Sequence, residues 1–504
     1  IAFGRRRLCY TFGTGRYHRR EEAGSYSSRY GDRLISYFCR MASSDTIVAL
    51  ATPNGTGAIA VIRLSGDDAI AIAARMFRGK DLNEVPSHTV HFGTIRDGSQ
   101  ILDEVLATVF VAPHSYTREN VVEFSVHNSP YIVSRLLQLA IDQGARSADP
   151  GEFTRRAFLN GGMDLSQAEA VADVIAAENK ASHEIAMSQL RGGISSAMRD
   201  MREQLINFTA LLELELDFSE EDVEFADRSE FLQLLANLKQ HITRLIRSFE
   251  YGNAIKNGVP VAIVGKPNAG KSTLLNTLLE EERAIVSDIA GTTRDTIEET
   301  MTIDGITFRF IDTAGLRETS DQIEAIGVAR AREKVRAAKI LLFLYDAQDN
   351  TFEEIVQQVR DLHRDELIVV LVRNKSDLPD KGLGSTLDDA LRRELLGSCA
   401  SDLVVISAKD PATVQPLKSV LVNHIRGLAV ADQQIITNLR HLEALKRAGE
   451  AIDNVTSGFE QGFSGDLLAP RLREAARHIG SITGEIDLDR DILGTIFGRF
   501  CIGK

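Results

Sequence analysis

The stretch GKPNAGKS (265–272) has the residue types and the spacing that are needed to hold a nucleotide phosphate. Its glycines let backbone N–H groups close around phosphate oxygens at the positive end of the helix predicted for TLLNTLLEE. Lys271 is expected to reach the β- and γ-phosphates, and Ser272 to bind Mg²⁺. The predicted phosphate-binding residues are Asn268, Ala269, Gly270, Lys271, Ser272 and Thr273.

Two later motifs predict which base the site accepts. NKSD (374–377) supplies Asp377, whose carboxylate oxygens can accept from the N1–H and 2-amino groups of guanine. Adenine cannot form that pair, so the predicted nucleotide is GTP. SAK (407–409) follows another strand-like run, and its backbone can contact the guanine O6. The residues assigned to the base side are Asn374, Lys375, Asp377, Ser407, Ala408 and Lys409.

Between these motifs lie two segments that can sense the γ-phosphate. Thr293 in GTTRD (291–295) is expected to contact Mg²⁺ and the γ-phosphate. DTAG (312–315) ends a strand, and its residues Asp312, Thr313, Ala314 and Gly315 are expected near the metal and the γ-phosphate.

The residue after DTAG is Leu316, which cannot orient water as the Gln of Ras-like proteins does. Glu324 is a candidate for that task, acting directly or through a second water. A solvated loop acid is the alternative interpretation of Glu324.

The elements that position these motifs form an alternating strand and helix pattern over 256–428. The predicted strands are VPVAIVG, TFRFIDTAG, ILLFLYDA, LIVVLVRN and LVVISA. Helical periodicity covers 163–255 and returns over 429–504, where Leu468, Leu472, Ala476 and Ile479 fall on one face. We therefore predict a Ras-like α/β GTPase domain inserted into an α-helical domain.

Residues 41–162 precede the helical region and alternate short apolar runs with turns, including the hairpin signal Asp97-Gly98. This pattern predicts an N-terminal α+β domain. Residues 1–40 stand apart, because they contain nine Arg but only three acidic residues. They are interpreted either as an organellar transit peptide or as an artificial extension before Met41.

Composition narrows the class of protein. No apolar run approaches the roughly 20 residues of a membrane span, so a soluble protein without membrane attachment is predicted. The net charge of −13 disfavours a surface that coats nucleic acid, so any such contact must be a local patch or be shared with a partner. The four cysteines lack metal-ligand spacing, which favours a reducing compartment.

The chain ends in FCIGK (500–504), and three interpretations of Cys501 were compared. A prenylation signal is disfavoured because Gly503 is not aliphatic and Lys504 is not a usual last residue. A packed apolar end and a reactive thiol both remain open from the residues alone.

Long strings in every part of the chain resemble the tRNA modification GTPase MnmE (TrmE) family. They include DTIVALATPNGTGAIAVIRLSG, PGEFTRRAFLNGGMDLSQAEAVADVI, GKPNAGKSTLLNTL, DTAGLRETSDQIEAIG and FCIGK. The resemblance implies an enzyme that works with the FAD-dependent MnmG (GidA) subunit. Together they would place an aminomethyl or carboxymethylaminomethyl group on C5 of the wobble uridine of certain tRNAs.

The same resemblance implies a tetrahydrofolate derivative (5-formyl- or methylene-) as one-carbon donor in the N-terminal domain. By position, Arg63, Glu123 and Lys504 would contact the folate, close to a catalytic Cys501. Folate carboxylates favour Arg or Lys, and the N–H groups of a pterin ring favour a carboxylate. The family commonly has a basic residue where this chain has Gly162, so one contact is expected to be missing.

For the GTPase cycle, the resemblance implies a requirement for K⁺. It also implies a homodimer that is held together by the N-terminal domains, with further, transient contacts between the GTPase domains. Glu324 matches the family's water-positioning acid, and Asn268, Ser287, Ile289 and Thr292 match the K⁺ ligands. Further implied nucleotide contacts are Ser287, Asp288, Ile289, Ala290, Gly291, Thr292 and Thr293.

Two other functions are compatible with parts of the sequence. A ribosome-assembly or regulatory GTPase of the Era or Der type would account for 256–428 but not for 41–162 or the cysteine tail. A membrane-anchored signalling GTPase would require a lipidated Cys501. The expected compartment is the bacterial cytoplasm, or a mitochondrion or plastid if residues 1–40 are a transit peptide.

Overall fold

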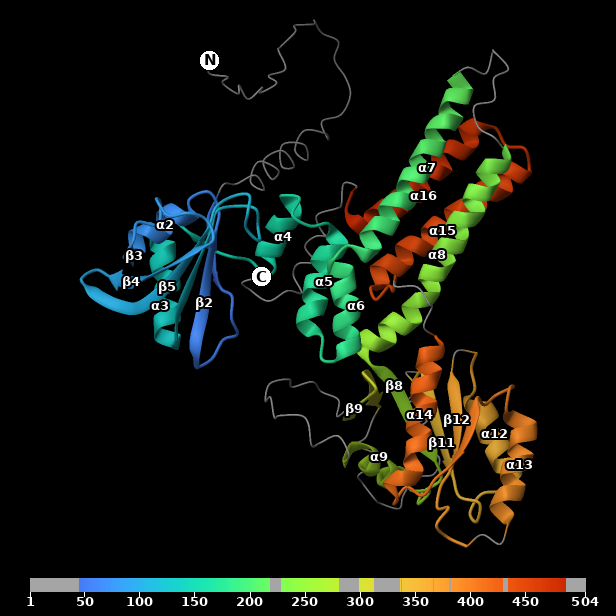
Figure 1. Cartoon of the computed structure of the whole chain (residues 1–504). Helices are drawn as coiled ribbons and strands as arrows, with labels where there is room; N and C mark the ends of the chain where they lie inside the picture. The colour runs from blue at the N-terminus through green and yellow to red at the C-terminus, as the bar shows by residue number, and fades with distance from the viewer. Residues whose placement is uncertain are drawn as a thin grey trace, which may run out of the picture. The chain divides into compact units, whose positions relative to one another are not determined.

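The computed structural model describes residues 45–217, 228–280, 299–311, 336, 338–365, 367–379, 382–428 and 434–485. The chain divides into two compact units (Figure 1). The first contains the residues up to Ser115 together with Glu119–Ala148, and the second contains Tyr116–Arg118 and the residues from Asp149 onward.

The first unit is built on a 7-stranded sheet with the order β3-β4-β5-β6-β2-β1-β7. Its neighbouring strands are antiparallel, except that β1 and β7 are parallel. The strands are β1 (Ile47–Leu50), β2 (Gly57–Ser65), β3 (Phe77–Arg78), β4 (Thr89–Asp97), β5 (Gln100–Phe110), β6 (Val121–Asn128) and β7 (Arg146–Ser147). The predicted hairpin turn at Asp97-Gly98 joins β4 to β5.

Helices α2 (Ala69–Met76) and α3 (Pro130–Asp142) cover one face of this sheet. Alternate residues of β5 therefore differ in environment: Val105 and Ala107 are buried in the core with α2 and α3, whereas Leu106 is 44% exposed. Leu106 lies opposite Phe92 of β4, which is 67% exposed. The uncovered face thus carries apolar side chains, and the predicted α+β domain is confirmed.

The second unit begins with helices that pack into a bundle. They are α4 (Glu152–Leu159), α5 (Leu165–Ala176), α6 (Lys180–Leu190), α7 (Gly193–Asp217), α8 (Arg228–Asn257), α15 (Leu439–Glu460) and α16 (Gly465–Thr483). Capping boxes at Asp164 and Asn179 start α5 and α6. The predicted apolar face of α16 is confirmed, because Leu468, Leu472, Ala476 and Ile479 lie in the bundle core.

A second sheet lies between α8 and α15 in sequence. It is 6-stranded, with the order β13-β12-β11-β8-β10-β9, and only the β9–β10 pair is antiparallel. Its strands are β8 (Val259–Gly265), β9 (Glu299–Ile303), β10 (Ile306–Phe310), β11 (Ile340–Tyr345), β12 (Ile368–Arg373) and β13 (Asp402–Val405). The predicted strands therefore form, and β9 was not predicted.

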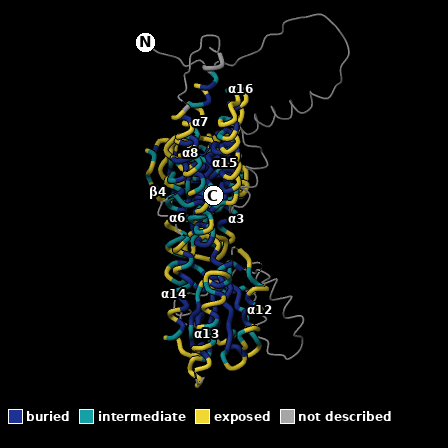
Figure 2. The backbone as a smooth tube through the Cα atoms, turned by 90° about the vertical axis from the view of Figure 1, so that its right-hand side faces the viewer, coloured by how far each residue is buried: buried dark blue, intermediate teal, exposed yellow. Residues whose placement is uncertain are grey.

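Helices cover both faces of this sheet. Residues of α9 (Lys271–Glu280) and α14 (Pro411–Gly427) share one core with the sheet, and residues of α12 (Phe352–Leu362) and α13 (Leu383–Leu395) share another. Every residue of β11 is buried, as expected of a parallel strand covered on both faces. Figure 2 shows the strands as largely buried tube beside α12, α13 and α14. The predicted inserted α/β domain is confirmed.

The chain enters and leaves this α/β domain at neighbouring points. The segment FEYGNAIKNG (249–258) forms the last turns of α8 and ends at Gly258, which has a φ of +76°. The returning segment 434–438 lies against α8 so closely that a Cβ on Gly252 would stand 2.2 Å from the carbonyl oxygen of Ile436. Throughout the ranges described above, no helix combines the length and the apolarity that a membrane crossing requires.

Candidate functional site

The predicted phosphate-binding residues form a loop between β8 and α9. Asn268 and Gly270 have positive φ values of 59° and 95°, which bend the backbone around the space in front of α9. The Lys271 ammonium donates to the carbonyls of Gly265 (2.9 Å) and Lys266 (2.7 Å), so it lies across the loop. Ser272 and Thr273 follow at the start of α9, where an anion is stabilised by the helix N-terminus.

Asn374 joins the phosphate loop to the base-binding motifs. Its buried side chain donates from Nδ2 to the Ala269 carbonyl (2.7 Å) and accepts at Oδ1 from the Ala408 N–H (2.8 Å). A Cβ on Gly270 would lie 2.1 Å from Asn374 Nδ2, so only glycine leaves room for this contact. Asn374 is 105 residues from Ala269 and 34 residues from Ala408 in sequence, so three distant motifs share one hydrogen-bonded centre.

The Asp377 carboxylate, predicted to select guanine, is held beside that centre. The Ser407 hydroxyl donates to Asp377 Oδ1 at 2.7 Å. This hydrogen bond, together with a bond from the backbone, lowers the pKa of Asp377 below its ordinary value, although desolvation acts in the opposite direction. Asp377 is therefore ionised at neutral pH and can accept two N–H donors, as recognition of guanine requires.

Further residues that support the site had not been singled out from the sequence. Thr277 of α9 donates to the Ala408 carbonyl (2.6 Å). Lys266 pairs with Glu354 (2.6 Å), and the Lys375 ammonium pairs with Asp346 (2.7 Å). Lys375 was already among the predicted base-side residues, and Lys266 lies inside the GKPNAGKS motif, which was a usable signal. Nothing in the sequence pattern marks Thr277 or Asp346.

Some predicted site residues lie outside the described residues. They are Ser287, Asp288, Ile289, Ala290, Gly291, Thr292, Thr293, Asp312, Thr313, Ala314, Gly315, Glu324, Cys501 and Lys504. Their roles stay predictions. Among the described candidates, the structure brings together the phosphate loop, Asn374, Asp377 and the 407–409 loop.

Arg63 and Glu123 form a second candidate site in the first unit. They lie opposite each other on β2 and β6, and Arg63 Nε donates to Glu123 Oε1 at 2.7 Å. Register places them on the face of the sheet that α2 and α3 leave uncovered, together with Leu106 and Phe92. Both side chains are partly exposed, at 19% and 25%. Gly162 belongs to the second unit, where its N–H donates to the Ala157 carbonyl.

The second unit combines a phosphate loop before a helix, an ionised Asp in an Asn-Lys-x-Asp motif and a largely parallel sheet. These features define a P-loop GTP-binding protein, whose α/β domain is inserted between helices of a helical domain. Two family models match the chain: "GTP-binding protein TrmE N-terminus" over residues 46–162 and "MnmE helical domain" over 165–501. The chain belongs to the MnmE family of tRNA modification GTPases.

Curated relatives match over nearly the whole chain. The tRNA modification GTPase MnmE of Cytophaga hutchinsonii is 51% identical over 462 residues, which cover 92% of this chain and 98% of the relative. The protein of the same name from Christiangramia forsetii is also 51% identical, over 92% of this chain and 100% of the relative. The match therefore includes the first unit as well as the GTPase domain.

A GTPase of this family binds GTP with Mg²⁺. Of the two predicted Mg²⁺ ligands, Ser272 lies directly after Lys271 at the start of α9, where its hydroxyl would hold the metal beside the phosphate loop. The other, Thr293, lies outside the described residues. The Ser272 hydroxyl is an oxygen donor, the ligand type that Mg²⁺ favours, and Mg²⁺ would keep several waters besides it.

Proposed function

We propose that this chain uses GTP hydrolysis to drive the modification of the wobble uridine of certain tRNAs. With an FAD-dependent MnmG (GidA) partner, it would place an aminomethyl or carboxymethylaminomethyl group on C5. The observation that carries this proposal is the arrangement of the phosphate loop, Asn374 and Asp377, which suits a guanine nucleotide, in a chain that matches tRNA modification GTPases over 92% of its length. A ribosome-assembly GTPase would leave the first unit without a role.

The one-carbon donor of this reaction is proposed to be a tetrahydrofolate derivative bound by the first unit. Arg63 offers a guanidinium to a folate carboxylate, and Glu123 offers acceptors to a pterin ring. Their ion pair on the uncovered face of the sheet supports this assignment, because it fixes both side chains before a ligand arrives. Lys504 would add a third contact.

Replacing Arg63 with Gln is expected to weaken tetrahydrofolate binding by about tenfold to a hundredfold, since one charge-assisted hydrogen bond is lost. Isothermal titration of the full chain with 5-formyltetrahydrofolate measures this directly. Arg135→Gln is the matched control, because Arg135 forms a similar ion pair with Asp97 and lies on α3, which covers the opposite face. Equal affinity in the wild type and Arg63→Gln would reject the assignment.

For hydrolysis, we propose that Glu324 positions the attacking water and that K⁺ stabilises the developing phosphate charge. Asn268, whose φ of 59° shapes the loop, would be one ligand, with Ser287, Ile289 and Thr292. A cation at this place performs the task of an arginine finger. GTP hydrolysis is expected to be at least about tenfold faster in K⁺ than in Na⁺. Equal rates in the two salts would contradict the role of K⁺.

The first unit is also proposed to hold two copies of the chain together, in addition to transient contacts between GTPase domains. Its uncovered sheet face exposes Val90 (56%), Phe92 (67%) and Leu106 (44%), which register places side by side. Apolar patches of this kind mark interaction surfaces. The Arg63–Glu123 pair lies beside these apolar side chains, so the face combines apolar and charged groups. A second copy carries the same combination and is therefore a suitable partner.

Phe92→Lys is expected to shift the nucleotide-free chain from dimer to monomer at micromolar concentration, because burying an unpaired charge in this face costs several kcal/mol. Sedimentation velocity measures the change. Ser134→Lys, on the exposed side of α3, adds the same charge as a control. A monomeric wild type, or a dimer that persists in Phe92→Lys, would contradict the proposal.

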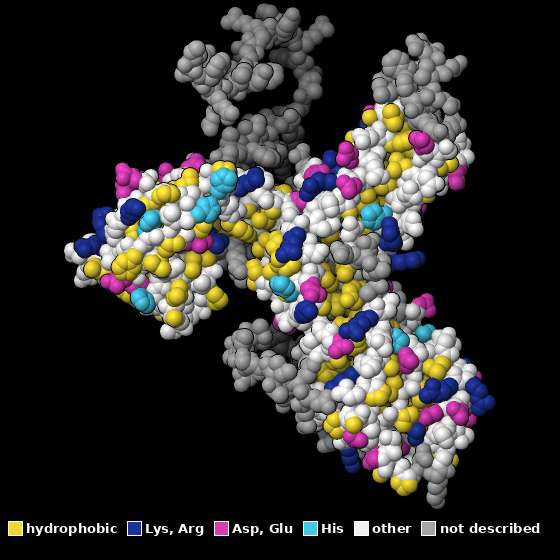
Figure 3. All heavy atoms as spheres, in the orientation of Figure 1, with side chains coloured by type: hydrophobic (Ala, Val, Ile, Leu, Met, Phe, Trp, Pro, Cys, Tyr) yellow, Lys and Arg dark blue, Asp and Glu magenta, His cyan; other side chains and the backbone are white. Residues whose placement is uncertain are grey.

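The tRNA contact is proposed to be local and shared with the FAD-dependent partner. The chain carries a net charge of −13, and Figure 3 shows Lys and Arg interspersed with Asp and Glu over the second unit. Binding to phosphates would need a larger basic field than this face provides. The proposed location is the bacterial cytoplasm, because the relatives compared above come from bacteria.

A further inference from the structure

A buried carboxylate of α13 joins the carboxyl ends of two strands of the second sheet. Asp388, which is 6% exposed, accepts from the Tyr345 hydroxyl at 2.5 Å and from Arg373 Nε at 2.9 Å. Tyr345 is the last residue of β11, and Arg373 is the last residue of β12. Register places these two residues directly opposite each other. Each oxygen of Asp388 therefore holds the end of one strand.

This network combines an ion pair with a neutral donor. Burial raises the pKa of Tyr345, and its hydrogen bond to Asp388 acts in the same direction, so the phenol keeps its proton at neutral pH. The side chains of Arg373 and Asp388 are 14% and 8% exposed, so little water can take the place of either partner. Removal of one partner from such a pair leaves a buried charge without compensation. Asp388 therefore determines where both neighbours lie.

Each strand continues directly into a residue of the predicted guanine site. Asn374, which links the phosphate loop to the base-side motifs, follows Arg373, and its N–H donates to the Tyr345 carbonyl at 2.9 Å. Asp346 follows Tyr345 and accepts from the Lys375 ammonium at 2.7 Å. The two strand ends held by Asp388 are thus connected to the NKSD motif within one or two residues.

The turn that carries Asp377 depends on how its ends are held. Lys375 has a φ of +61°, which lies in the left-handed region that favours glycine. A residue in this region keeps its conformation only while the surrounding structure fixes it. The far side of the turn is held by the Ser376 N–H, which donates to the Ile406 carbonyl, and by the Ser407 hydroxyl, which donates to Asp377. The near side is held by the strand ends.

We propose that Asp388 is a positioning residue for guanine recognition, because it fixes the strand ends from which the NKSD turn begins. The proposal rests on the proposed base contact of Asp377. Guanine can donate two hydrogen bonds to the Asp377 carboxylate, and hypoxanthine can donate only one, because it lacks the 2-amino group. A displaced carboxylate therefore loses more affinity for GTP than for inosine triphosphate.

The test compares the binding of GTP and inosine triphosphate by the full chain. The wild type is expected to bind GTP at least about tenfold more tightly, since the 2-amino group adds one charge-assisted hydrogen bond. Asp388→Asn is expected to weaken GTP binding by about tenfold and to reduce the GTP preference by about threefold or more. Equilibrium titration with each nucleotide measures both quantities. A loss of stability alone lowers both affinities by the same factor and leaves the preference unchanged.

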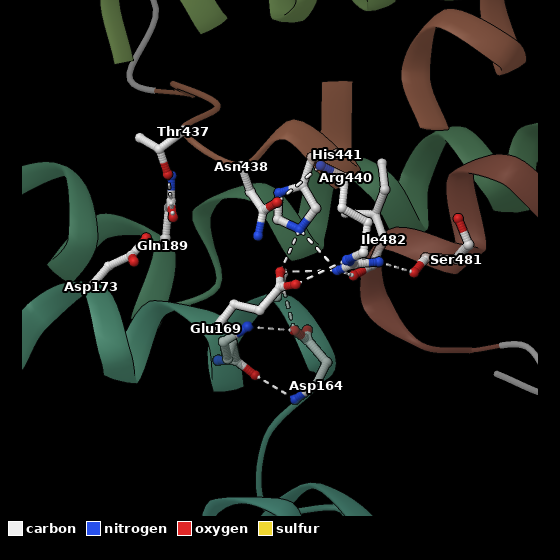
Figure 4. A network of polar contacts seen from close by, with 12 residues as sticks. Asp164, Glu169, Asp173, Gln189, Thr437, Asn438, Arg440, His441, Ser481 and Ile482 are labelled. Atoms are coloured by element: carbon white, nitrogen blue, oxygen red, sulfur yellow. Dashed lines mark hydrogen bonds and ion pairs between the residues drawn. The ribbon is translucent and has the colours of Figure 1, made fainter. Parts of the chain in front are cut away.

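Two control variants separate position from charge and from stability. Asp389→Asn removes the neighbouring, exposed carboxylate of the same helix and should keep the wild-type preference. Glu169→Gln breaks a comparable ion pair between α5 and α15, in which Arg440 contacts both oxygens of Glu169 at 2.9 Å (Figure 4). That pair joins helices outside the inserted α/β domain, so Glu169→Gln should lower stability and keep the preference for GTP.

Tyr345→Phe decides the question if Asp388→Asn fails to fold. It removes one hydroxyl and leaves the Asp388–Arg373 pair in place, so a smaller fall in the GTP preference, about twofold, is expected. The proposal is overturned if Asp388→Asn keeps the wild-type preference. It is equally overturned if Asp388→Asn does not fold and Tyr345→Phe keeps that preference.

Failure of the base contact and failure of the positioning role have different signatures. Asp377→Asn should remove the preference for GTP over inosine triphosphate, whatever the role of Asp388. If Asp377→Asn keeps the wild-type preference, the base contact is wrong and the positioning role falls with it. If Asp377→Asn removes the preference and Asp388→Asn does not reduce it, the base contact stands and only the role of Asp388 fails.

Discussion

Asp377→Asn is expected to lower the affinity for GTP by about a hundredfold, which corresponds to about 3 kcal/mol, and to create affinity for xanthosine triphosphate. In the proposed base contact, the Asp377 carboxylate would accept from N1–H and the 2-amino group of guanine, and an amide would replace one acceptor by a donor. Xanthine carries an oxygen at C2, so the amide complements it. Equilibrium titration with both nucleotides measures the exchange.

Asp389→Asn serves as the control for this experiment, since Asp389 is an exposed carboxylate on α13 of the same domain. Its GTP affinity should equal that of the wild type. Wild-type GTP affinity in Asp377→Asn, or a loss of GTP binding without any gain for xanthosine triphosphate, would contradict the assigned base contact. The second outcome would indicate that Asp377 supports the loop through Ser407 instead.

Cys501→Ser is expected to reduce tRNA modification by at least about a hundredfold and to leave GTP hydrolysis within about twofold. A serine hydroxyl ionises far less readily than a thiol and is a much weaker nucleophile near neutral pH. Cys501 is not among the residues assigned to the GTP site, so hydrolysis is not expected to need this side chain. The measurement pairs a GTPase assay with nucleoside analysis of tRNA from cells that express only the variant.

Cys399→Ser is the matched control, because Cys399 lies among partly buried residues that pack against the core of the GTPase domain. Both activities should survive in that variant. If Cys501→Ser retained modification, the thiol would have no part in the chemistry. If it lost both activities, the tail would serve folding or GTP hydrolysis instead.

Local sequence patterns predicted the GTPase domain well, because several of its nucleotide-binding motifs follow directly after its strands in sequence. The apolar runs of β8, β11 and β12 are continuous, as buried parallel strands require, and β8 and β12 lead directly into nucleotide-binding motifs. The short strand β9 was missed, because ETMTI is half polar and, among the described strands, pairs with β10 alone through the Asp304-Gly305 turn.

Contacts between distant residues could not be predicted from sequence. Glu169 and Arg440 are 271 residues apart, and each alone is typical of an exposed helical charge. The bridge from Asn374 to Ala269 and Ala408 likewise depends on three loops meeting. In β5, apolar residues occupy both faces, so the sequence could not indicate that Leu106 stays uncovered while Ala107 is buried.

Nucleoside analysis of total tRNA from cells that lack this chain tests the central claim most directly. In a host with no redundant pathway, the C5-modified wobble uridine is expected to disappear and to return when the wild-type chain is supplied. Persistence of the modified nucleoside at its normal level in the deletion strain would contradict the account.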